Sequence, residues 1–254
     1  MKGTTGAILA CLTCAAAFGA VAFAQTGIPS GENLEIGAKV CAETKMLHET
    51  ADQYRQRKES ERYTPSWIWK SVTSMNGTPD TMSFTFKIAD GQRVLQVSGL
   101  IDAEAAENLE AALTAYAPVH EVWLNSPGGN SRVGVEMGAI LRRHQVLTRV
   151  RSGDGCASAC STAFLGGVMR DVEPGAAYGV HMYTTQIDTT DVLDQDTFNT
   201  VQWGGAQGAA ERMAYVQKMG VGLKWLQLWS DTAPGCMTFM SQSEMRSAFV
   251  NNLR

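Results

Sequence analysis

The chain has 254 residues, of which 44% are hydrophobic and 18% are charged, so it can form one ordinary globular domain with an added arm and is neither disordered nor fibrous. Its 21 Lys and Arg residues against 25 Asp and Glu residues give a formal charge of -4, which leaves no positive surplus for binding nucleic acid. Histidine is scarce and no Cys-x-x-Cys pair occurs outside the first 14 residues, so neither a metal nor another cofactor is expected.

The first 24 residues have the pattern of a secretory signal peptide. Lys2 precedes an apolar run of small residues from Ala7 to Phe23, and Ala22-Phe23-Ala24 fits the small-x-small cleavage pattern. A retained membrane anchor is the alternative, but the apolar run is at the lower limit of the length that spans a bilayer. We therefore expect cleavage near Ala24/Gln25 and a mature protein that is periplasmic or secreted.

Residues 25–82 are expected to form a polar N-terminal arm and a loop. Between residues 27 and 63 the chain is mostly polar, with a few apolar residues at helical spacing, which predicts one helix with a narrow apolar face. The Ser- and Thr-rich segment 71–81 predicts a loop. The functional domain is expected to occupy residues 83–254.

This domain begins with a hairpin and continues as repeated strand and helix units. Phe84, Phe86 and Ile88 alternate with polar residues, and Asp90-Gly91 predicts a tight turn into the next strand. Further strands are expected at Val94–Val97, Val119–Leu124, Val146–Val150 and Ala177–Tyr183. Helices are expected near residues 102–117, 131–143, 207–219, 223–229 and 241–249, with a small-residue helix after residue 157. Repeated units of this kind predict an α/β fold with a parallel sheet flanked by helices.

Three segments of the domain are candidates for chemistry. Pro127-Gly128-Gly129 is a sharp turn that presents backbone N–H groups beside a helix N-terminus, although the same residues also make an ordinary turn. Ser158 lies among small residues at a strand-to-helix junction, where its hydroxyl would be exposed; the alternatives are close packing of a buried helix, or Ser161 as the nucleophile. His181 lies in an apolar strand after Ser158 and is either a base or a buried core histidine.

The order and spacing of these segments resemble the proteolytic subunit of the Clp protease, within the ClpP/crotonase superfamily. They resemble most a secreted branch with a Cys-x-Ser-x-Cys nucleophile segment. The resemblance covers about Val94 to Val250. It is carried by Val94–Gly99, Leu124–Gly129, Gly155–Gly166, Val180-His181 and Asp231-Thr232 followed by Phe239-Met240-Ser241.

The resemblance implies a role for each candidate residue. Ser158 would be the nucleophile, His181 the general base, and Asp231 the carboxylate that orients the histidine. The oxyanion hole would be formed by the N–H groups of Gly128 or Gly129 and of Ala159. The glycine-rich segment with Gly204 and Gly205 would lie against an extended peptide substrate.

The function expected from this resemblance is that of a secreted, ATP-independent serine peptidase acting on peptides or unfolded proteins, with no ATPase partner. Residues 183–201 are rich in Thr and Asp where the family has a long docking helix, which leaves association into a homo-oligomer as an open expectation. Acidic residues of this segment predict a solvated loop rather than a metal site. Two alternatives are a catalytically inactive ClpP-fold binding or assembly module and a crotonase-type enzyme acting on acyl thioesters.

The mature chain would keep four cysteines, Cys41, Cys156, Cys160 and Cys236, in an oxidising compartment. If the triad forms, residues near Ser158 and Asp231 must lie close together. We therefore expect Cys236 to bond Cys156 or Cys160, and the other of these to bond Cys41. The alternative is a local bond between Cys156 and Cys160.

Overall fold

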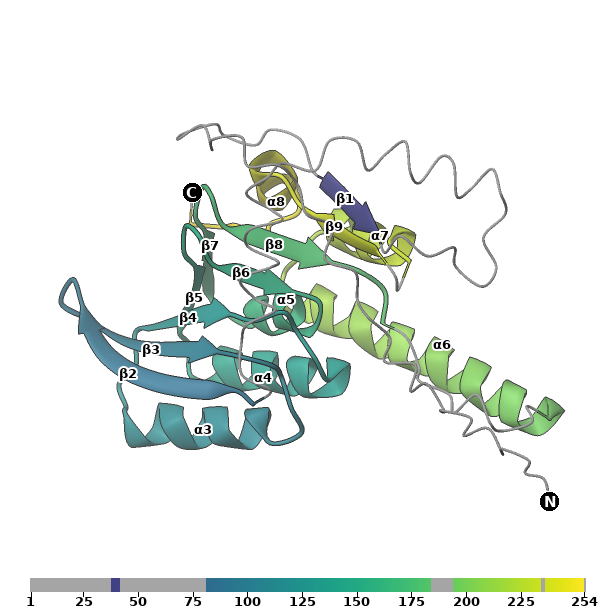
Figure 1. The fold of residues 1–254 in the computed structure, drawn as a ribbon, viewed down its shortest axis with the longest axis horizontal. Coiled ribbons are helices and arrows are strands. Elements are labelled where there is room, and N and C mark those ends of the chain that lie inside the picture. Colours follow the sequence, from purple (N-terminus) through teal and green to yellow (C-terminus); the bar gives the residue numbers. More distant parts are fainter. Residues whose placement is uncertain (1–37, 42–80, 184–193, 234–235, 254) are drawn as a thin grey trace, which may run out of the picture.

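The computed structural model describes residues 38–41, 81–183, 194–233 and 236–253 (Figure 1). The predicted signal peptide and most of the predicted arm, with its expected helix, lie outside these residues. Within the described ranges, no helix combines the length and the apolar character needed to cross a membrane.

The larger sheet has five strands in the order β2-β3-β4-β5-β7. β2 and β3 form the expected antiparallel hairpin, with Asp90 and Gly91 at positive φ in its turn, whereas all later pairs of this sheet are parallel. The strands are β2 (Ser83–Ala89), β3 (Gln92–Ser98), β4 (Glu121–Asn125), β5 (Leu147–Val150) and β7 (Met169–Val172).

The smaller sheet has four strands in the order β1-β9-β8-β6. β6 and β8 are parallel, and β9 runs antiparallel to both β8 and β1. A bridge between Ser126 and Cys156 joins the end of β4 to β6, so the two sheets meet there. The strands are β1 (Ala38–Cys41), β6 (Gly155–Ala157), β8 (Ala177–Val180) and β9 (Cys236–Phe239).

Helices cover the larger sheet on one face, where α4 packs between α3 and α5 (Figure 1). α4 begins at Asn130, whose side chain accepts the N–H groups of Arg132 and Val133, and buries an apolar stripe that includes Met137 and Leu141. The helices are α3 (Ala105–Ala115), α4 (Ser131–Arg143), α5 (Ala159–Phe164), α6 (Gln195–Lys218), α7 (Leu223–Asp231) and α8 (Gln242–Ser247).

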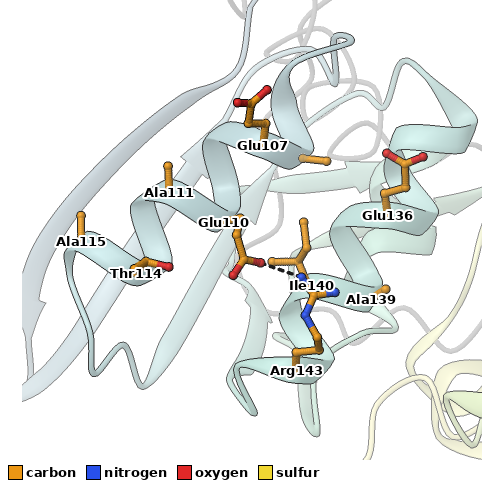
Figure 2. A pocket seen from close by; sticks show the side chains of 10 residues that line it. Glu107, Glu110, Ala111, Thr114, Ala115, Glu136, Ala139, Ile140 and Arg143 are labelled. Atoms are coloured by element: carbon orange, nitrogen blue, oxygen red, sulfur yellow. Dashed lines mark hydrogen bonds and ion pairs between the residues drawn. The ribbon is translucent and has the colours of Figure 1, made fainter.

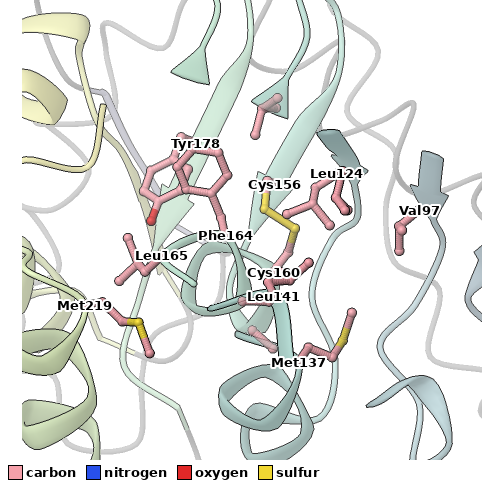
Figure 3. Packing of buried hydrophobic residues seen from close by; sticks show 14 of the residues in the cluster. Val97, Leu124, Met137, Leu141, Cys156, Cys160, Phe164, Leu165, Tyr178 and Met219 are labelled. Carbon is pink, nitrogen blue, oxygen red and sulfur yellow. A yellow bond between two sulfur atoms is a disulfide. The ribbon is translucent and has the colours of Figure 1, made fainter. Parts of the chain in front are cut away.

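The hydrophobic core lies where the two sheets meet α4 and α5 (Figure 3). Leu124 of β4, Met137 of α4, Phe164 of α5 and Tyr178 of β8 are all buried there. The core therefore fixes the β4–α4 and β6–α5 junctions relative to one another, and both candidate catalytic turns lie at these junctions.

The predicted α/β fold with a mostly parallel sheet flanked by helices is confirmed. Strands β1, β7 and β9 were not expected from the sequence. β7 contains Arg170 and Asp171, which are both buried, so it lacks the apolar alternation by which a strand is identified. β1 comes from the segment predicted to be a polar arm, and it pairs with β9 along the edge of the smaller sheet.

α6 was expected to begin near residue 207, but it is a continuous helix from Gln195. The Asp194 side chain accepts the Thr197 N–H at 2.7 Å, which caps the helix twelve positions earlier in the chain than expected. Its buried residues all lie in its C-terminal half, and the N-terminal half projects from the domain (Figure 1).

Candidate active site

Ser158 and His181 lie at the carboxyl ends of two neighbouring parallel strands. β6 and β8 pair with Ala157 opposite Gly179, and the Ser158 N–H continues the ladder by donating to the Gly179 carbonyl at 3.0 Å. Parallel strands of matched register end at the same edge of a sheet, so the two side chains emerge together. Ser158 Oγ and His181 Nε2 are 2.7 Å apart, the distance of a strong hydrogen bond.

The backbone at Ser158 makes a sharp turn from β6 into α5. Ser158 has φ of 57° and ψ of -123°, a conformation that L residues rarely adopt and that is found where the surrounding structure enforces it. The Ser161 N–H and Oγ both donate to the Ser158 carbonyl, at 3.1 and 2.6 Å. Ser161 is 1% exposed and bonded to the main chain, which favours Ser158 over Ser161 as the nucleophile.

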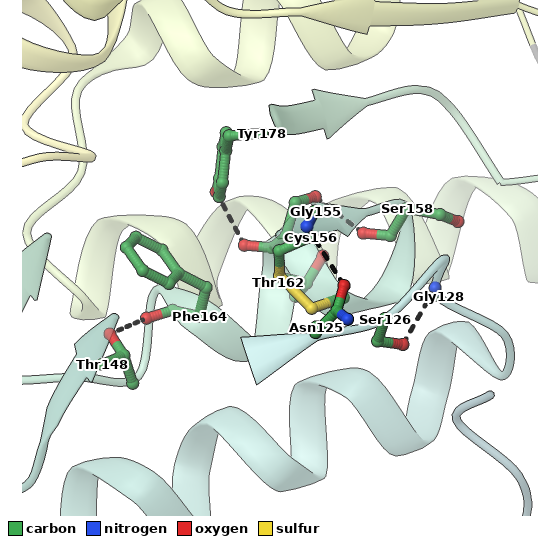
Figure 4. The surroundings of a disulfide bond; sticks show 12 residues. Asn125, Ser126, Gly128, Thr148, Gly155, Cys156, Ser158, Thr162, Phe164 and Tyr178 are labelled. Carbon is green, nitrogen blue, oxygen red and sulfur yellow. Dashed lines mark hydrogen bonds between the residues drawn. A yellow bond between two sulfur atoms is a disulfide. The ribbon is translucent and has the colours of Figure 1, made fainter. Parts of the chain in front are cut away.

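Gly128 packs directly against the nucleophile turn. It has φ of 105°, and a Cβ at this position would lie 2.6 Å from Ser158 Cβ and 2.9 Å from the Ala159 nitrogen. Only glycine combines this φ with so close an approach. The Gly128 N–H donates to Ser126 Oγ at 3.1 Å, so this amide is already used within the turn (Figure 4).

Among the described residues, the N–H groups of Gly129 and Ala159, which both lie near Ser158, donate to no acceptor. Ala159 is the first residue of α5, so its N–H has no partner within the helix. The Gly128 carbonyl accepts the Ile101 N–H at 2.7 Å, and the N–H of Gly129 points away from that bond because the peptide unit is trans. Of the two glycines that the sequence left open, Gly129 is therefore the one with an available donor.

The disulfide prediction was wrong. Cys156 and Cys160 bond each other, with their Cα atoms 5.2 Å apart, and the bond is buried in the core (Figures 3 and 4). The turn at Ser158 brings the two together, whereas β8 separates β6 from β9 and its Cys236. Two strand spacings, about 9.6 Å, exceed the reach of a disulfide. Cys236 is itself disulfide-bonded, and Cys41 lies opposite it in the β1–β9 register.

Asp231 is the last residue of α7, and it is exposed. The next residue, Thr232, accepts the Met182 N–H at 2.9 Å, so the end of α7 lies beside the segment that follows His181. The role of Asp231 in orienting His181 stays a prediction. Of the acidic residues in the competing segment, Asp188 and Asp191 lie outside the described residues, while Asp194 caps α6.

Gly204 and Gly205 do not form the extended segment that the resemblance implies. Both lie inside α6, where backbone N–H and carbonyl groups are used by the helix. The Gly205 carbonyl also accepts the Tyr183 hydroxyl at 2.8 Å, and a Cβ at Gly208 would lie 2.7 Å from that oxygen. Part of this glycine-rich segment thus lets Tyr183, two residues after His181, pack against α6.

Arg212 of α6 was not predicted as a site residue. Its side chain is buried and donates hydrogen bonds to Thr162 of α5 and to Ser131 of α4, next to both candidate catalytic turns. A single arginine in a helix of mixed composition gives no local signal of such a role. It became recognisable only once the three helices were placed together.

An open groove of about 680 Å³ lies elsewhere, between α3 and α4 (Figure 2). Its lining includes Ala106, Ala111 and Ala139 with Glu107 and Glu136, and none of the site residues above contributes to it. In the ranges that the structure describes, no three His, Cys, Asp or Glu side chains are grouped so that they could hold a metal ion.

Taken together, the junction of β6 and α5 holds a serine hydroxyl against an imidazole, with two backbone donors nearby. Comparison of the chain with protein-family models and with curated proteins gave no match.

Proposed function

We propose that this protein is a secreted serine hydrolase of the ClpP/crotonase type that cleaves peptide bonds without ATP. The observation that carries the proposal is the 2.7 Å contact between Ser158 Oγ and His181 Nε2 at a strained strand-to-helix turn. A serine hydroxyl is a weak nucleophile unless a base takes its proton, and this contact has the geometry for that transfer. An ordinary core histidine would not require Ser158 to adopt so rare a backbone conformation.

The reaction would follow the acyl-transfer sequence. Ser158 Oγ attacks the substrate carbonyl carbon while its proton passes to His181 Nε2, and the carbonyl oxygen becomes an oxyanion. The N–H groups of Gly129 and Ala159 stabilise that oxyanion, each by about 2.7–4 kcal/mol. His181 then gives the proton to the leaving amine, and water releases the acyl group by the same steps in reverse roles. Asp231 is the proposed group that orients the imidazole.

The proposed substrates are peptides or unfolded proteins, and no ATPase partner is required. Cleavage of the N-terminal segment near Ala24/Gln25 would deliver the enzyme to the periplasm or the medium. Association of copies remains part of the proposal, since the projecting half of α6 exposes Phe198 and Trp203.

The proposal is tested by treating the purified protein with a fluorophosphonate probe and mapping the modified residue by mass spectrometry. We expect modification of Ser158, its loss in Ser158→Ala, and its retention in Ser161→Ala. His181→Ala should slow the modification by about 10²–10⁴-fold, because the general base is lost.

Other outcomes would favour the alternative functions. A folded protein that resists the probe and cleaves no peptide would be a ClpP-fold binding or assembly module. Turnover of acyl thioesters that persists in Ser158→Ala would indicate a crotonase-type enzyme, which needs the oxyanion hole and not the serine. Modification of Ser158→Ala at the wild-type rate would disprove the nucleophile assignment.

A further inference from the structure

The two donors of the proposed oxyanion hole belong to different parts of the fold. Gly129 lies in the turn before α4, whereas Ala159 is the first residue of α5. The helices are in close contact there, since a Cβ at Gly134 of α4 would lie 2.6 Å from the Ala159 carbonyl oxygen. An oxyanion hole stabilises the developing charge only when both donors point at one position. The contact between α4 and α5 at Gly134 and Ala159, here called the seam, therefore has to be held in place.

Arg212 bridges this seam from α6. It is 5% exposed, and it donates from Nη1 to Thr162 Oγ1 in the first turn of α5. From Nη2 it donates to the hydroxyl and carbonyl of Ser131, the first residue of α4. The Trp229 ring, 5.9 Å from Cζ, packs on the guanidinium. The planar guanidinium of Arg212 therefore contacts the first turns of α4 and α5, the two helices that begin at or next to the oxyanion donors.

The positive charge of Arg212 indicates that this residue does more than fill the space between the helices. Helix N-termini are partially positive, so a cation buried beside two of them is costly, and burial lowers the pKa of the Arg212 guanidinium. A neutral side chain would satisfy Thr162 and Ser131 at lower cost. The positive charge of Arg212 and the two helix N-termini together stabilise an anion that forms at the start of α5, where the proposed tetrahedral intermediate would lie.

We propose that Arg212 is a positioning residue for the oxyanion hole, which holds the Gly129 and Ala159 donors at their working separation through Ser131 and Thr162. This inference rests on the proposed serine hydrolase function. It extends that function to a residue that touches neither the substrate nor the nucleophile.

The test compares Arg212→Met with Arg142→Met. Arg142 joins the same two helices at their other end, where it donates to the carbonyls of Leu165, Gly166 and Gly167. Both changes remove a guanidinium that links α4 to α5 or to the residues just after it, buried in Arg212 and half-buried in Arg142, but only Arg212 is near the oxyanion donors. The rate of Ser158 modification by the probe, and kcat and KM on a peptide substrate, are measured with the free energy of unfolding.

We expect Arg212→Met to lower kcat and the modification rate about 10²-fold with little change in KM, as for a misplaced catalytic group. Arg142→Met should lower stability yet keep the modification rate close to that of the wild type at temperatures where it is folded. Arg212→Lys keeps the charge and one donor nitrogen, and should recover part of the rate. Arg212→Lys also serves as the test if Arg212→Met fails to fold.

Three results would overturn the inference. If Ser158 is modified in the wild type and equally fast in the Arg212 variants, the positioning role is wrong and the proposed function stands. If Arg212→Met and Arg142→Met lose rate and stability in parallel, Arg212 is structural only. A wild-type protein whose Ser158 is not modified disproves the proposed function, and the inference with it.

Discussion

Gly128 shows how closely the site depends on single residues. Its backbone is the neighbour of both Ser158 Cβ and the Ala159 nitrogen, and its own N–H is held by Ser126 Oγ. Any side chain at this position would occupy the space in front of the Ala159 donor. The turn therefore requires the glycine, and so does the proposed site.

We expect Gly128→Ala to lower the rate of Ser158 modification by about 10²-fold or more, because the added methyl group displaces the nucleophile turn and blocks a donor. Gly91→Ala is the matched control: Gly91 also has positive φ, at 74°, but a Cβ there meets nothing within 4 Å. In both variants, placing an alanine at positive φ lowers the free energy of unfolding by about 1–3 kcal/mol. Equal modification rates in the two variants would contradict the role of Gly128.

The carboxylate that orients His181 is tested by exchanging acids for amides. If Asp231 is that group, Asp231→Asn should lower kcat on a peptide substrate about 10⁴-fold, as expected when the imidazole loses its orienting partner. Asp188→Asn and Asp191→Asn should keep most of the activity. Wild-type turnover in Asp231→Asn, together with its loss in one of the other two variants, would move the assignment to residues 184–193.

At the scale of elements, the short β6–α5 unit is held around Ser158 by several independent links. β8 pairs with it on one side, Ser161 bonds the Ser158 carbonyl, and the Cys156–Cys160 disulfide spans the turn from within the core. A three-residue strand and a six-residue helix have little stability of their own. The disulfide therefore supports the unusual conformation of Ser158, the proposed nucleophile.

Removing this disulfide in Cys156→Ala/Cys160→Ala should lower the free energy of unfolding by about 2 kcal/mol, the value for a closed loop this short. The Ser158 modification rate should fall by about tenfold even where the variant is fully folded, because the turn is no longer fixed. Denaturant titration and probe kinetics measure the two effects. Cys236→Ala removes a disulfide away from the turn, and a rate loss as large in that variant would argue against a local effect.

At the scale of the whole molecule, Arg170 forms hydrogen bonds with backbone carbonyls at the C-terminal ends of three helices. Its guanidinium donates to the carbonyls of Leu165 after α5, Met219 after α6, and Phe249 and Val250 after α8. Unpaired carbonyls at helix ends are partially negative, so one cation satisfies several of them. Burial is the main cause that lowers the pKa of Arg170 to about 10, which leaves it charged at neutral pH.

We expect Arg170→Met to lower the free energy of unfolding by at least about 3 kcal/mol, because several buried carbonyls lose their donor at once. Arg246→Met, on the exposed face of α8, should change it by less than about 0.5 kcal/mol. Urea titration of both variants measures the difference. A loss in Arg170→Met no larger than in Arg246→Met would show that the carbonyls find other partners.

The sequence by itself determined most of the alternation of strands and helices and marked the two junctions of the candidate site. Ser158 and Pro127-Gly128-Gly129 were recognisable because turn residues between periodic segments act locally. The hairpin at Asp90-Gly91 was predicted for the same reason. Local patterns thus located the candidate site along the chain.

Only the tertiary structure decided which groups meet. The order β1-β9-β8-β6 put one strand between Cys156 and Cys236, so the disulfide formed locally instead. A hydrogen bond to Ser126 occupies the Gly128 N–H, whereas the Gly129 N–H has no acceptor in the described part of the chain. The packing of α6 brought Arg212 to the seam of α4 and α5. Strand order and helix packing depend on contacts between residues far apart in the chain, and the periodicity of a single segment carries no information about them.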